Sequence, residues 1–345
     1  MKDNLKSMTI PEIGTILKQM GQPAFRAKQV FTWLHKGVRS YDEMSNLPQN
    51  LRAVLAEQYP ICAPEVVRRQ ESQKDGTIKY LWRLADGNCV ETVLMRYHYG
   101  NTVCISSEVG CRMGCAFCAS TLGGLVRKLE PYEMLDQVLF TQVDSGLPIS
   151  HIVLMGIGEP MDNLDAVLQA TQILTADYGF AWSPKRITVS TVGVRKGIER
   201  FLKESDCHLA VSLHNPFHDQ RAEIMPIEKA HHLSDVVALL KQYDWSHQRR
   251  VSFEYICWGG SNDSAKHANE LLRILKGLDC RINLIRFHAS PDNESGQKPL
   301  PSSSEKQMEW LRDYLTEKGI TTTIRKSRGE DILAACGMLV NALKE

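Results

Sequence analysis

The chain has 345 residues, 43% of them hydrophobic, which is enough apolar material for one large domain or two domains. A formal net charge of +1 excludes a uniformly basic surface, so any nucleic-acid partner must be held by local patches. The first residues lack the apolar stretch of a signal peptide, and no apolar run is long enough to cross a bilayer. We therefore expect a cytoplasmic protein with no membrane partner. In that compartment thiols stay reduced, and clustered cysteines favour metal binding or chemistry.

The N-terminal part differs in texture from the rest of the chain. Residues 1–60 are expected to form a helical accessory domain, because the segment 13–37 has the pattern of two amphipathic helices with Gly37 as a stop. Its basic residues fit either an ordinary solvated helix face or an RNA-docking surface. Residues 61–100 are expected to form a β-hairpin extension between the helical domain and the rest of the chain, because "KDGT" and "ADGN" are turn sequences between strand-like segments.

Strand-like and helix-like segments alternate through residues 101–330. The helical segments show apolar residues at spacings of three and four, and the strand segments are short and rich in β-branched residues. This alternation predicts an α/β fold with a parallel sheet, closed as a partial (β/α)6 TIM-like barrel whose ligands bind at the C-terminal strand ends. Residues 331–345 are expected to form a C-terminal tail. The expected strands are 101–108, 151–157, 186–192, 208–214, 251–257, 281–287 and 321–326.

Three cysteines lie within eight residues in the stretch "GCRMGCAFCAS". Cys111, Cys115 and Cys118 have the spacing Cys-x3-Cys-x2-Cys, and thiolates suit zinc or iron–sulfur clusters. Structural zinc would need a fourth ligand from elsewhere, which the spacing alone does not exclude. Three cysteines on one loop favour a four-iron cluster, because they leave one iron open to a substrate.

Polar residues also follow several of the expected strands. Glu159 in "GIGEP" can accept hydrogen bonds from an ammonium group. Ser190 in "STVG" and residues 212–214 in "SLH" can hydrogen-bond a ribose or a carboxylate. Taken singly, each of these is as well explained by an ordinary strand end followed by a turn.

The cysteine motif, with Phe117 just before the last cysteine, resembles the radical S-adenosylmethionine (SAM) superfamily. Further motifs extend the resemblance over nearly the whole chain, and they are similar to those of the RlmN/Cfr family of radical SAM RNA methyltransferases. The matched pieces are "FRAKQVFTWLHKGV", "VETVLMRY", "CISSEVGCRMGCAFC", "MGIGEPMDN", "STVGV", "SLH", "NLIR" and "AACG".

The resemblance implies two kinds of cofactor. A [4Fe-4S] cluster is expected on Cys111, Cys115 and Cys118, and two SAM molecules are expected per turnover. The chain departs from the family at His288, where the family usually has an asparagine that contacts SAM. The SAM contacts carried over from the family are Gly158, Glu159, Ser190, Ser212, Leu213, His214 and, through this replacement, His288.

The resemblance also assigns three catalytic roles. Cys336 is expected to become an S-methylcysteine, whose methyl group loses a hydrogen atom to a deoxyadenosyl radical and then adds to the adenine ring. Cys104 is expected to release the product by forming a transient disulfide with Cys336. Glu91 is expected to accept the ring proton. Without the resemblance, Cys336 would be an ordinary small hydrophobe and Glu91 a solvent-facing strand residue.

The expected substrate is C2 of adenosine 2503 in 23S rRNA, with adenosine 37 of some tRNAs as a second target. "GEPMDN" resembles the C2-methylating members, whereas "NLIRF" also resembles the Cfr members, so C8 methylation stays an alternative. An electron donor such as flavodoxin and a monomeric state are expected. A non-catalytic iron–sulfur RNA-binding protein is the alternative of another class, and another radical SAM activity is a third. The presence of both Cys104 and Cys336 argues against a non-catalytic protein, which would have no use for the two reactive thiols.

Overall fold

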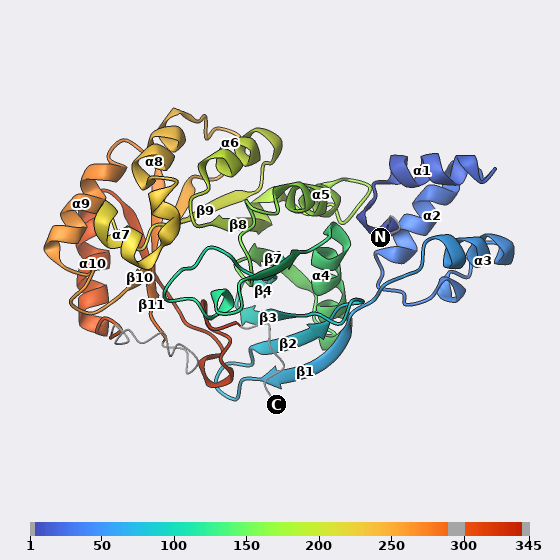
Figure 1. The fold of residues 1–345 in the computed structure, drawn as a ribbon, viewed down its shortest axis with the longest axis horizontal. Helices are drawn as coiled ribbons and strands as arrows, with labels where there is room; N and C mark the ends of the chain where they lie inside the picture. The colour runs from blue at the N-terminus through green and yellow to red at the C-terminus, as the bar shows by residue number, and fades with distance from the viewer. Residues whose placement is uncertain (1–3, 289–300, 340–345) are drawn as a thin grey trace.

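The computed structural model describes residues 4–288 and 301–339. Its N-terminal region is helical and lies to one side of the sheet, as Figure 1 shows in blue. Helix α1 begins with a capping box between Thr9 and Glu12, and the chain leaves α2 through Gly37, which has a φ of +85°. The elements here are η1 (Leu5–Ser7), α1 (Ile10–Gln19), α2 (Phe25–Leu34), η2 (Tyr41–Glu43) and α3 (Gln49–Gln58).

One ten-stranded sheet runs through the remainder of the molecule, in the order β1-β2-β3-β4-β7-β8-β9-β10-β11-β12. The pairs from β1 to β4 are antiparallel, and every later pair is parallel. The two expected turns join β1 to β2 and β2 to β3. The strands are β1 (Glu65–Glu71), β2 (Ile78–Arg83), β3 (Cys89–Tyr97), β4 (Gly100–Cys104), β7 (Ile149–Leu154), β8 (Ile187–Thr191), β9 (His208–Ser212), β10 (Val251–Cys257), β11 (Cys280–Arg286) and β12 (Thr321–Arg325).

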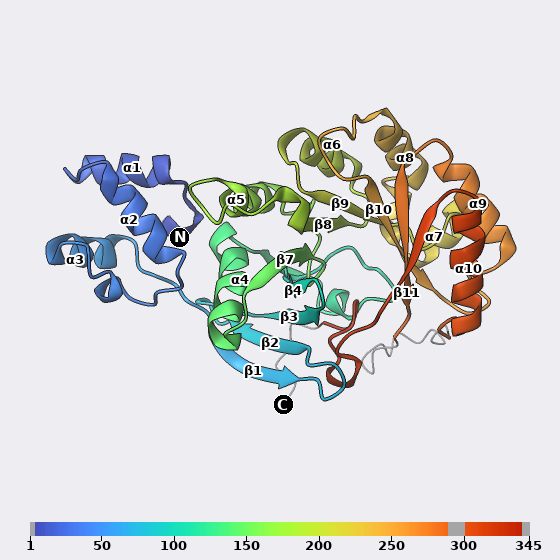
Figure 2. The ribbon, with the colours of Figure 1, turned by 180° about the vertical axis from the view of Figure 1, so that it is seen from behind.

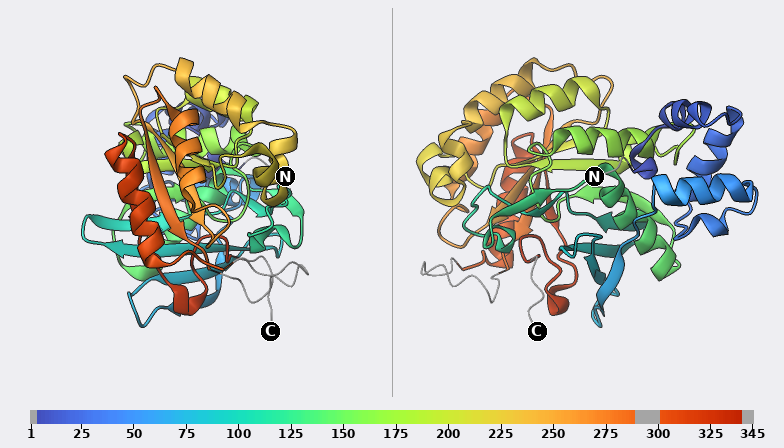
Figure 3. Two further views of the ribbon diagram at one scale, coloured as in Figure 1. Left: turned by 90° about the vertical axis from the view of Figure 1, so that its left-hand side faces the viewer. Right: turned by 45° about the vertical axis from the view of Figure 1, so that its right-hand side comes forward.

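Helices alternate with the parallel strands and cover the outer face of the curved sheet (Figures 2 and 3). Six β/α units from β4 to α10, completed by β12, confirm the expected partial barrel. The helices are α4 (Pro131–Ser145), α5 (Leu164–Thr175), α6 (Arg195–Glu204), α7 (His218–Ile224), α8 (Leu233–Gln242), α9 (Ala265–Leu275) and α10 (Glu305–Glu317), with η4 (Pro184–Arg186) before β8 and η5 (Pro226–Lys229) after α7.

The expected strand 101–108 is divided in the structure. β4 ends at Cys104, and β5 (Glu108–Gly110) pairs instead with β6 (Leu125–Lys128) in a separate two-stranded sheet. The break occurs because Ser107 leaves the main sheet, with its amide donating to the carbonyl of Ile157 at 2.9 Å. The small sheet flanks the cysteine loop, which contains η3 (Ala119–Thr121), and so fixes both of its ends.

A single hydrophobic core joins the N-terminal helices to the barrel, extending from Leu5 to Leu315. The buried ammonium of Lys6 pairs with the buried carboxylate of Asp136 on α4, so η1 is fixed to the barrel. In the part of the chain that the structure describes, no helix is long and apolar enough to span a membrane. Because β1–β3 share the sheet of the barrel, the expected boundaries between domains stay predictions.

Candidate active site

One pocket lies at the C-terminal ends of the barrel strands. It is lined by the cysteine loop, by the loops that follow β7, β8 and β9, and by the C-terminal tail. The sequence-predicted residues that the structure brings together around it are Cys111, Cys115, Cys118, Gly158, Glu159, Ser190, Ser212, His214 and Cys336.

The cysteine loop presents three free thiols to this pocket. Burial raises the pKa of Cys111 to about 12, and burial also raises the pKa of Cys115 and Cys118. A metal-bound charge would offset that cost. A single tetrahedral zinc ion needs sulfur atoms about 3.8 Å apart. Within residues 4–288 and 301–339, the three Sγ atoms do not all lie within 4.8 Å of one another, so in this conformation they do not surround one tetrahedral zinc ion.

Glu159 joins two loops beneath the pocket. Its buried carboxylate accepts hydrogen bonds from the amides of Met161 at 3.0 Å and Val192 at 2.9 Å. Burial raises its pKa to about 7, so a cationic ligand would favour the charged form.

Glu108, which the sequence analysis missed, supports Glu159 from below. Its carboxylate accepts a hydrogen bond from the Glu159 amide at 2.9 Å, and burial raises its pKa to about 7. A Cβ at position 158 would lie 2.6 Å from the Glu108 Cβ, and Gly158 has a φ of +106°. Glycine is therefore required at this position for two independent reasons.

His214 is held as a neutral ring in the pocket wall. Burial lowers its pKa to about 3, and its Nδ1 accepts a hydrogen bond from the Ile256 amide at 3.0 Å. The proton of the neutral ring is therefore on Nε2. The ring of Phe117 meets it edge-on, with centroids 4.9 Å apart, and thus connects the cysteine loop to the end of β9.

The C-terminal tail is bound to the cysteine loop. The amide of Ala119 donates to the carbonyl of Gly337 at 2.8 Å, and the hydroxyl of Ser120 donates to the carbonyl of Leu339 at 2.8 Å. Gly337 has a φ of +81°, and a Cβ there would lie 3.3 Å from the Phe117 carbonyl. This close approach places the exposed Cys336 at the pocket.

The β1–β2 hairpin binds the tail from the other side. The carboxylate of Asp331 accepts hydrogen bonds from the Ser72 hydroxyl at 2.7 Å and the Gln73 amide at 3.1 Å. The ammonium of Lys79 donates to the carbonyl of Leu333 at 3.2 Å. The β1–β2 hairpin therefore supports the segment that carries Cys336.

Cys104 is buried against the tail, in an apolar cluster with Ala334 and Leu339. Burial raises the pKa of its thiol to about 12, and negative charge at Cys336 acts in the same direction. Arg325 on β12 lines the pocket, with Nη1 3.8 Å from Glu254 Oε2. A negative charge on the Cys336 sulfur would be the largest cause raising the pKa of Arg325. The sequence analysis missed Arg325, which lines the pocket together with Cys336.

Glu91 is a buried residue of β3, so a solvent-facing position is wrong for it. Its Oε1 lies 3.1 Å from Nζ of Lys79, which is also buried. In the sheet, Lys79 on β2 and Cys104 on β4 both pair with Val93 on β3. Glu91 is two residues before Val93 and therefore lies on the same face of β3.

Comparison with known proteins identifies the family. Residues 3–61 match the ribosomal RNA large subunit methyltransferase N-terminal domain, and residues 105–275 match the radical SAM superfamily. The chain is 49% identical to a probable dual-specificity RNA methyltransferase RlmN of Bacteroides fragilis, over 99% of this chain and 97% of that protein. A relative of the same description from Lachnoclostridium phytofermentans is 46% identical, over 98% and 94%. The chain belongs to the RlmN family.

The fold agrees with a solved structure of the same chemistry. A radical SAM methyltransferase from Sphaerobacter thermophilus superposes with a TM-score of 0.90 at 38% identity, covering 97% of this chain and 98% of that one. The protein is thus a SAM-dependent methyltransferase of the radical SAM superfamily, which implies a [4Fe-4S] cluster and SAM as cofactors.

Two SAM contacts expected for an RlmN-family member do not line the pocket. Leu213 is fully buried, and its amide donates to the carbonyl of Glu254 at 2.9 Å, so it supports the pocket wall from behind. His288 has Nε2 2.7 Å from the Ser327 hydroxyl and 3.5 Å from the Glu330 carboxylate. Their roles toward SAM stay predictions.

Proposed function

We propose that this enzyme methylates C2 of an adenine in RNA, with Cys336 as the methyl carrier. The expected targets are adenosine 2503 of 23S rRNA and adenosine 37 of tRNAs. The observation that carries the proposal is the position of Cys336, which lies on a tail bound to the cysteine loop, at the pocket, with a second thiol buried behind it.

The residues of the pocket fit the cofactors of the family. Cys111, Cys115 and Cys118 would hold the cluster, and Glu159 would bind the amino group of SAM, with Gly158, Ser190, Ser212 and His214 around it. When bound, the cluster and two SAM molecules per turnover supply the methyl group and the radical that removes a hydrogen atom from it. The protein contributes ligands, orientation and a site closed by the tail.

Cys104 is proposed as the residue that releases the product. Its thiolate attacks the sulfur of Cys336, so that a sulfur–sulfur bond forms while the bond from that sulfur to the RNA-linked carbon breaks. The carbon keeps the electron pair of the broken bond and takes up a proton, which completes the methyl group on the base. The resulting disulfide needs two electrons from an external reductant, and an electron donor such as flavodoxin is expected to supply the cluster. Burial keeps the Cys104 thiol protonated until this step, because its pKa is raised to about 12.

Glu91 is proposed as the proton acceptor. Its carboxylate is buried beside the ammonium group of Lys79, and this ammonium group also contacts the tail at Leu333. A carboxylate that faces a buried ammonium in a site with little water is suited to receive a proton from the RNA base.

A basic cavity of about 700 Å³ is the surface that best fits RNA. It lies within the barrel and shares Met155, Glu254 and Arg325 with the pocket. Five exposed cations line it and make no ion pair within the described residues. By contrast, the basic residues Arg127 and Lys128 beside the cysteine loop pair with acidic side chains. Two tyrosines at its edge, stacked with centroids 4.9 Å apart, suit base stacking. The residues are Lys185, Arg186, Arg249, Arg281, Lys326, Tyr97 and Tyr99.

Nucleoside analysis tests the proposal. The reconstituted enzyme is incubated with SAM, reductant and unmethylated 23S rRNA or tRNA, and the digested RNA is analysed by mass spectrometry against synthetic standards. The proposal expects 2-methyladenosine that is absent with the Cys336→Ala variant. 8-Methyladenosine would show that the enzyme methylates C8, as the Cfr members do. The absence of any methyladenosine would overturn the proposal.

A further inference from the structure

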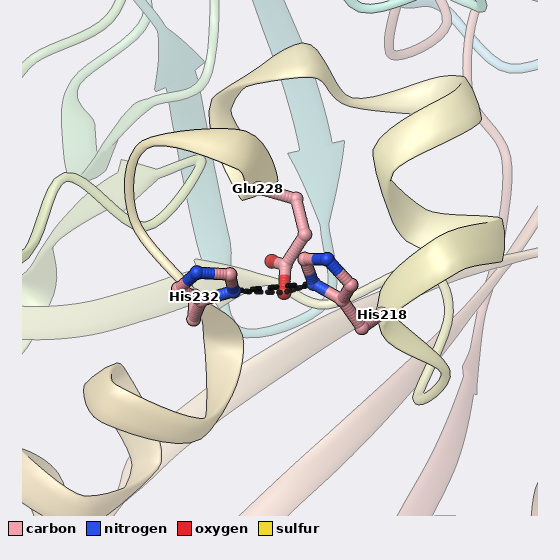
Figure 4. A group of neighbouring side chains, drawn as sticks. All are labelled: His218, Glu228 and His232. Carbon is pink, nitrogen blue, oxygen red and sulfur yellow. Dashed lines mark hydrogen bonds and ion pairs between the residues drawn. The ribbon is translucent and has the colours of Figure 1, made fainter.

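Three ligand-type side chains converge on the outer surface of the barrel, outside the pocket lining. They are His218 on α7, Glu228 on η5 and His232 just before α8 (Figure 4). The Nδ1 of His218 lies 2.9 Å from Glu228 Oε1 and 3.2 Å from His232 Nδ1, and His232 Nδ1 lies 3.8 Å from Glu228 Oε1. Within the described ranges, this is the one group whose ligand atoms all lie within 4.8 Å of one another.

These separations match the edges of a tetrahedral metal site. A zinc ion bonded at about 2.0–2.1 Å to nitrogen and oxygen ligands holds those atoms about 3.3 Å apart, and the three measured separations lie on both sides of that value. Hydrogen bonding explains the arrangement less completely. The Nδ1 atoms of the two histidines face the same carboxylate oxygen and also contact each other. A proton on His218 Nδ1 that is donated to Glu228 leaves that nitrogen unable to accept from His232, so hydrogen bonds satisfy only some of the three contacts.

The carboxylate is already oriented toward the two histidines. Glu228 is buried, and its Oε2 is bound by the guanidinium of Arg221. Both carboxylate oxygens also accept from the Leu233 amide at 3.1 Å. Such supporting contacts fix a ligand before the ion arrives. The two histidine side chains are 49% exposed, so an ion can enter from solvent and keep a water molecule as a fourth ligand.

We propose that His218, Glu228 and His232 bind a divalent cation of the zinc class, with one coordination position open to water. Two imidazoles and one carboxylate are ligands that zinc prefers over magnesium or calcium. The site joins α7, η5 and the start of α8 across a cavity of about 260 Å³.

The site is connected to the pocket through Arg221. This guanidinium donates to the carbonyls of Val192 and Ser212 at 2.8 Å and to that of Leu213 at 3.0 Å, so it joins the ends of β8 and β9. The C-terminus of α7 also bonds the cysteine loop, since the Ala116 amide donates to the Ile224 carbonyl at 2.9 Å. A bound ion would therefore stiffen the wall that carries Ser212 and His214.

Metal analysis of the intact holoenzyme tests the proposal. Protein with a full cluster is dialysed anaerobically against buffered Zn²⁺, and zinc and iron are measured per chain. We expect about one zinc per chain at unchanged iron content, with affinity reduced at least about 100-fold in His218→Ala and His232→Ala. The matched control is His231→Ala, which changes the neighbouring histidine and should bind zinc as the wild type does.

X-ray absorption at the zinc edge of the wild-type protein gives a second, independent result. Nitrogen and oxygen ligands without sulfur support the site, whereas sulfur ligands would assign the zinc to the cysteine loop and overturn the proposal. Equal zinc binding by the wild type and both alanine variants, or no zinc uptake by the wild type at micromolar free Zn²⁺, would overturn it as well.

Discussion

Lys79 contacts both the proposed base and the tail that carries the proposed methyl carrier. Its Nζ lies 3.1 Å from Glu91 Oε1 and donates to the carbonyl of Leu333, three residues before Cys336, at 3.2 Å. Both side chains of the ion pair are almost completely buried. The Lys79 side chain therefore links the β1–β2 hairpin to the proposed proton acceptor and to the tail.

We predict that Lys79→Met destabilises the protein by about 3 kcal/mol, because it removes one charge of a buried ion pair together with the hydrogen bond to the tail. The control is Arg83→Met on the same strand, where the pair with Glu65 is exposed and should contribute less than about 1 kcal/mol. Urea unfolding monitored by circular dichroism measures both. Equal effects of the two substitutions would contradict the interpretation of the buried pair.

A second prediction concerns Cys104. If this thiol releases the product, Cys104→Ala should still carry a methyl group on Cys336 but should stall as a covalent adduct with RNA. Denaturing gels with labelled RNA would show the adduct, and RNase treatment would remove it. Cys207→Ala, which changes another buried cysteine, is the control and should turn over normally. A Cys104→Ala enzyme that turns over at the wild-type rate would exclude the assigned role.

Much of the fold could be predicted from the sequence because its determinants are local. Each parallel strand is a short β-branched run, each long helix has its own apolar periodicity, and the cysteine loop is defined by spacing. Helix α7 cannot be predicted in this way, because "HDQRAEI" has no such periodicity. The end of β4 was also misplaced, because only tertiary hydrogen bonds make the chain leave the sheet at Ser107.

The parts of the site that the sequence did not predict are contacts between distant segments. Lys79 and Leu333 are 254 positions apart, and Arg325 and Cys336 line the same pocket only after β12 and the tail fold together. Glu108 was missed because its importance depends on the glycine above it. In each case the side chain has no special neighbours in the sequence, and its environment arises only from packing.

The proposed contact of Glu159 with the amino group of SAM predicts a pH dependence of SAM binding. Burial raises the pKa of Glu159 to about 7, and the proposed contact needs the ionised carboxylate. Protonation therefore competes with binding as the pH falls below about 7, and affinity should weaken about tenfold between pH 7.5 and pH 6. Equilibrium dialysis of labelled SAM with the cluster-loaded enzyme measures this. Glu159→Gln should bind weakly with a flat profile, and a flat wild-type profile would contradict the assignment.

Neutralising the basic cavity should weaken RNA binding without changing the cofactors. For Lys185→Gln combined with Arg186→Gln, we expect a lower affinity and a salt slope reduced by about 0.7 for each phosphate contact that is lost. Lys276→Gln, at the exposed end of α9, removes one positive charge away from the cavity and is the control. Fluorescence anisotropy of a labelled tRNA anticodon stem-loop at several salt concentrations gives both quantities. An unchanged slope in the double variant would place the RNA elsewhere.

The role of Cys336 as methyl carrier is tested most directly by mass spectrometry of the Cys336 peptide, from anaerobically purified enzyme with an intact cluster and incubated with SAM. We expect a single added methyl group on the Cys336 sulfur that is absent from Cys336→Ala. An unmodified Cys336 in such a preparation would contradict the proposed mechanism, whatever the RNA substrate.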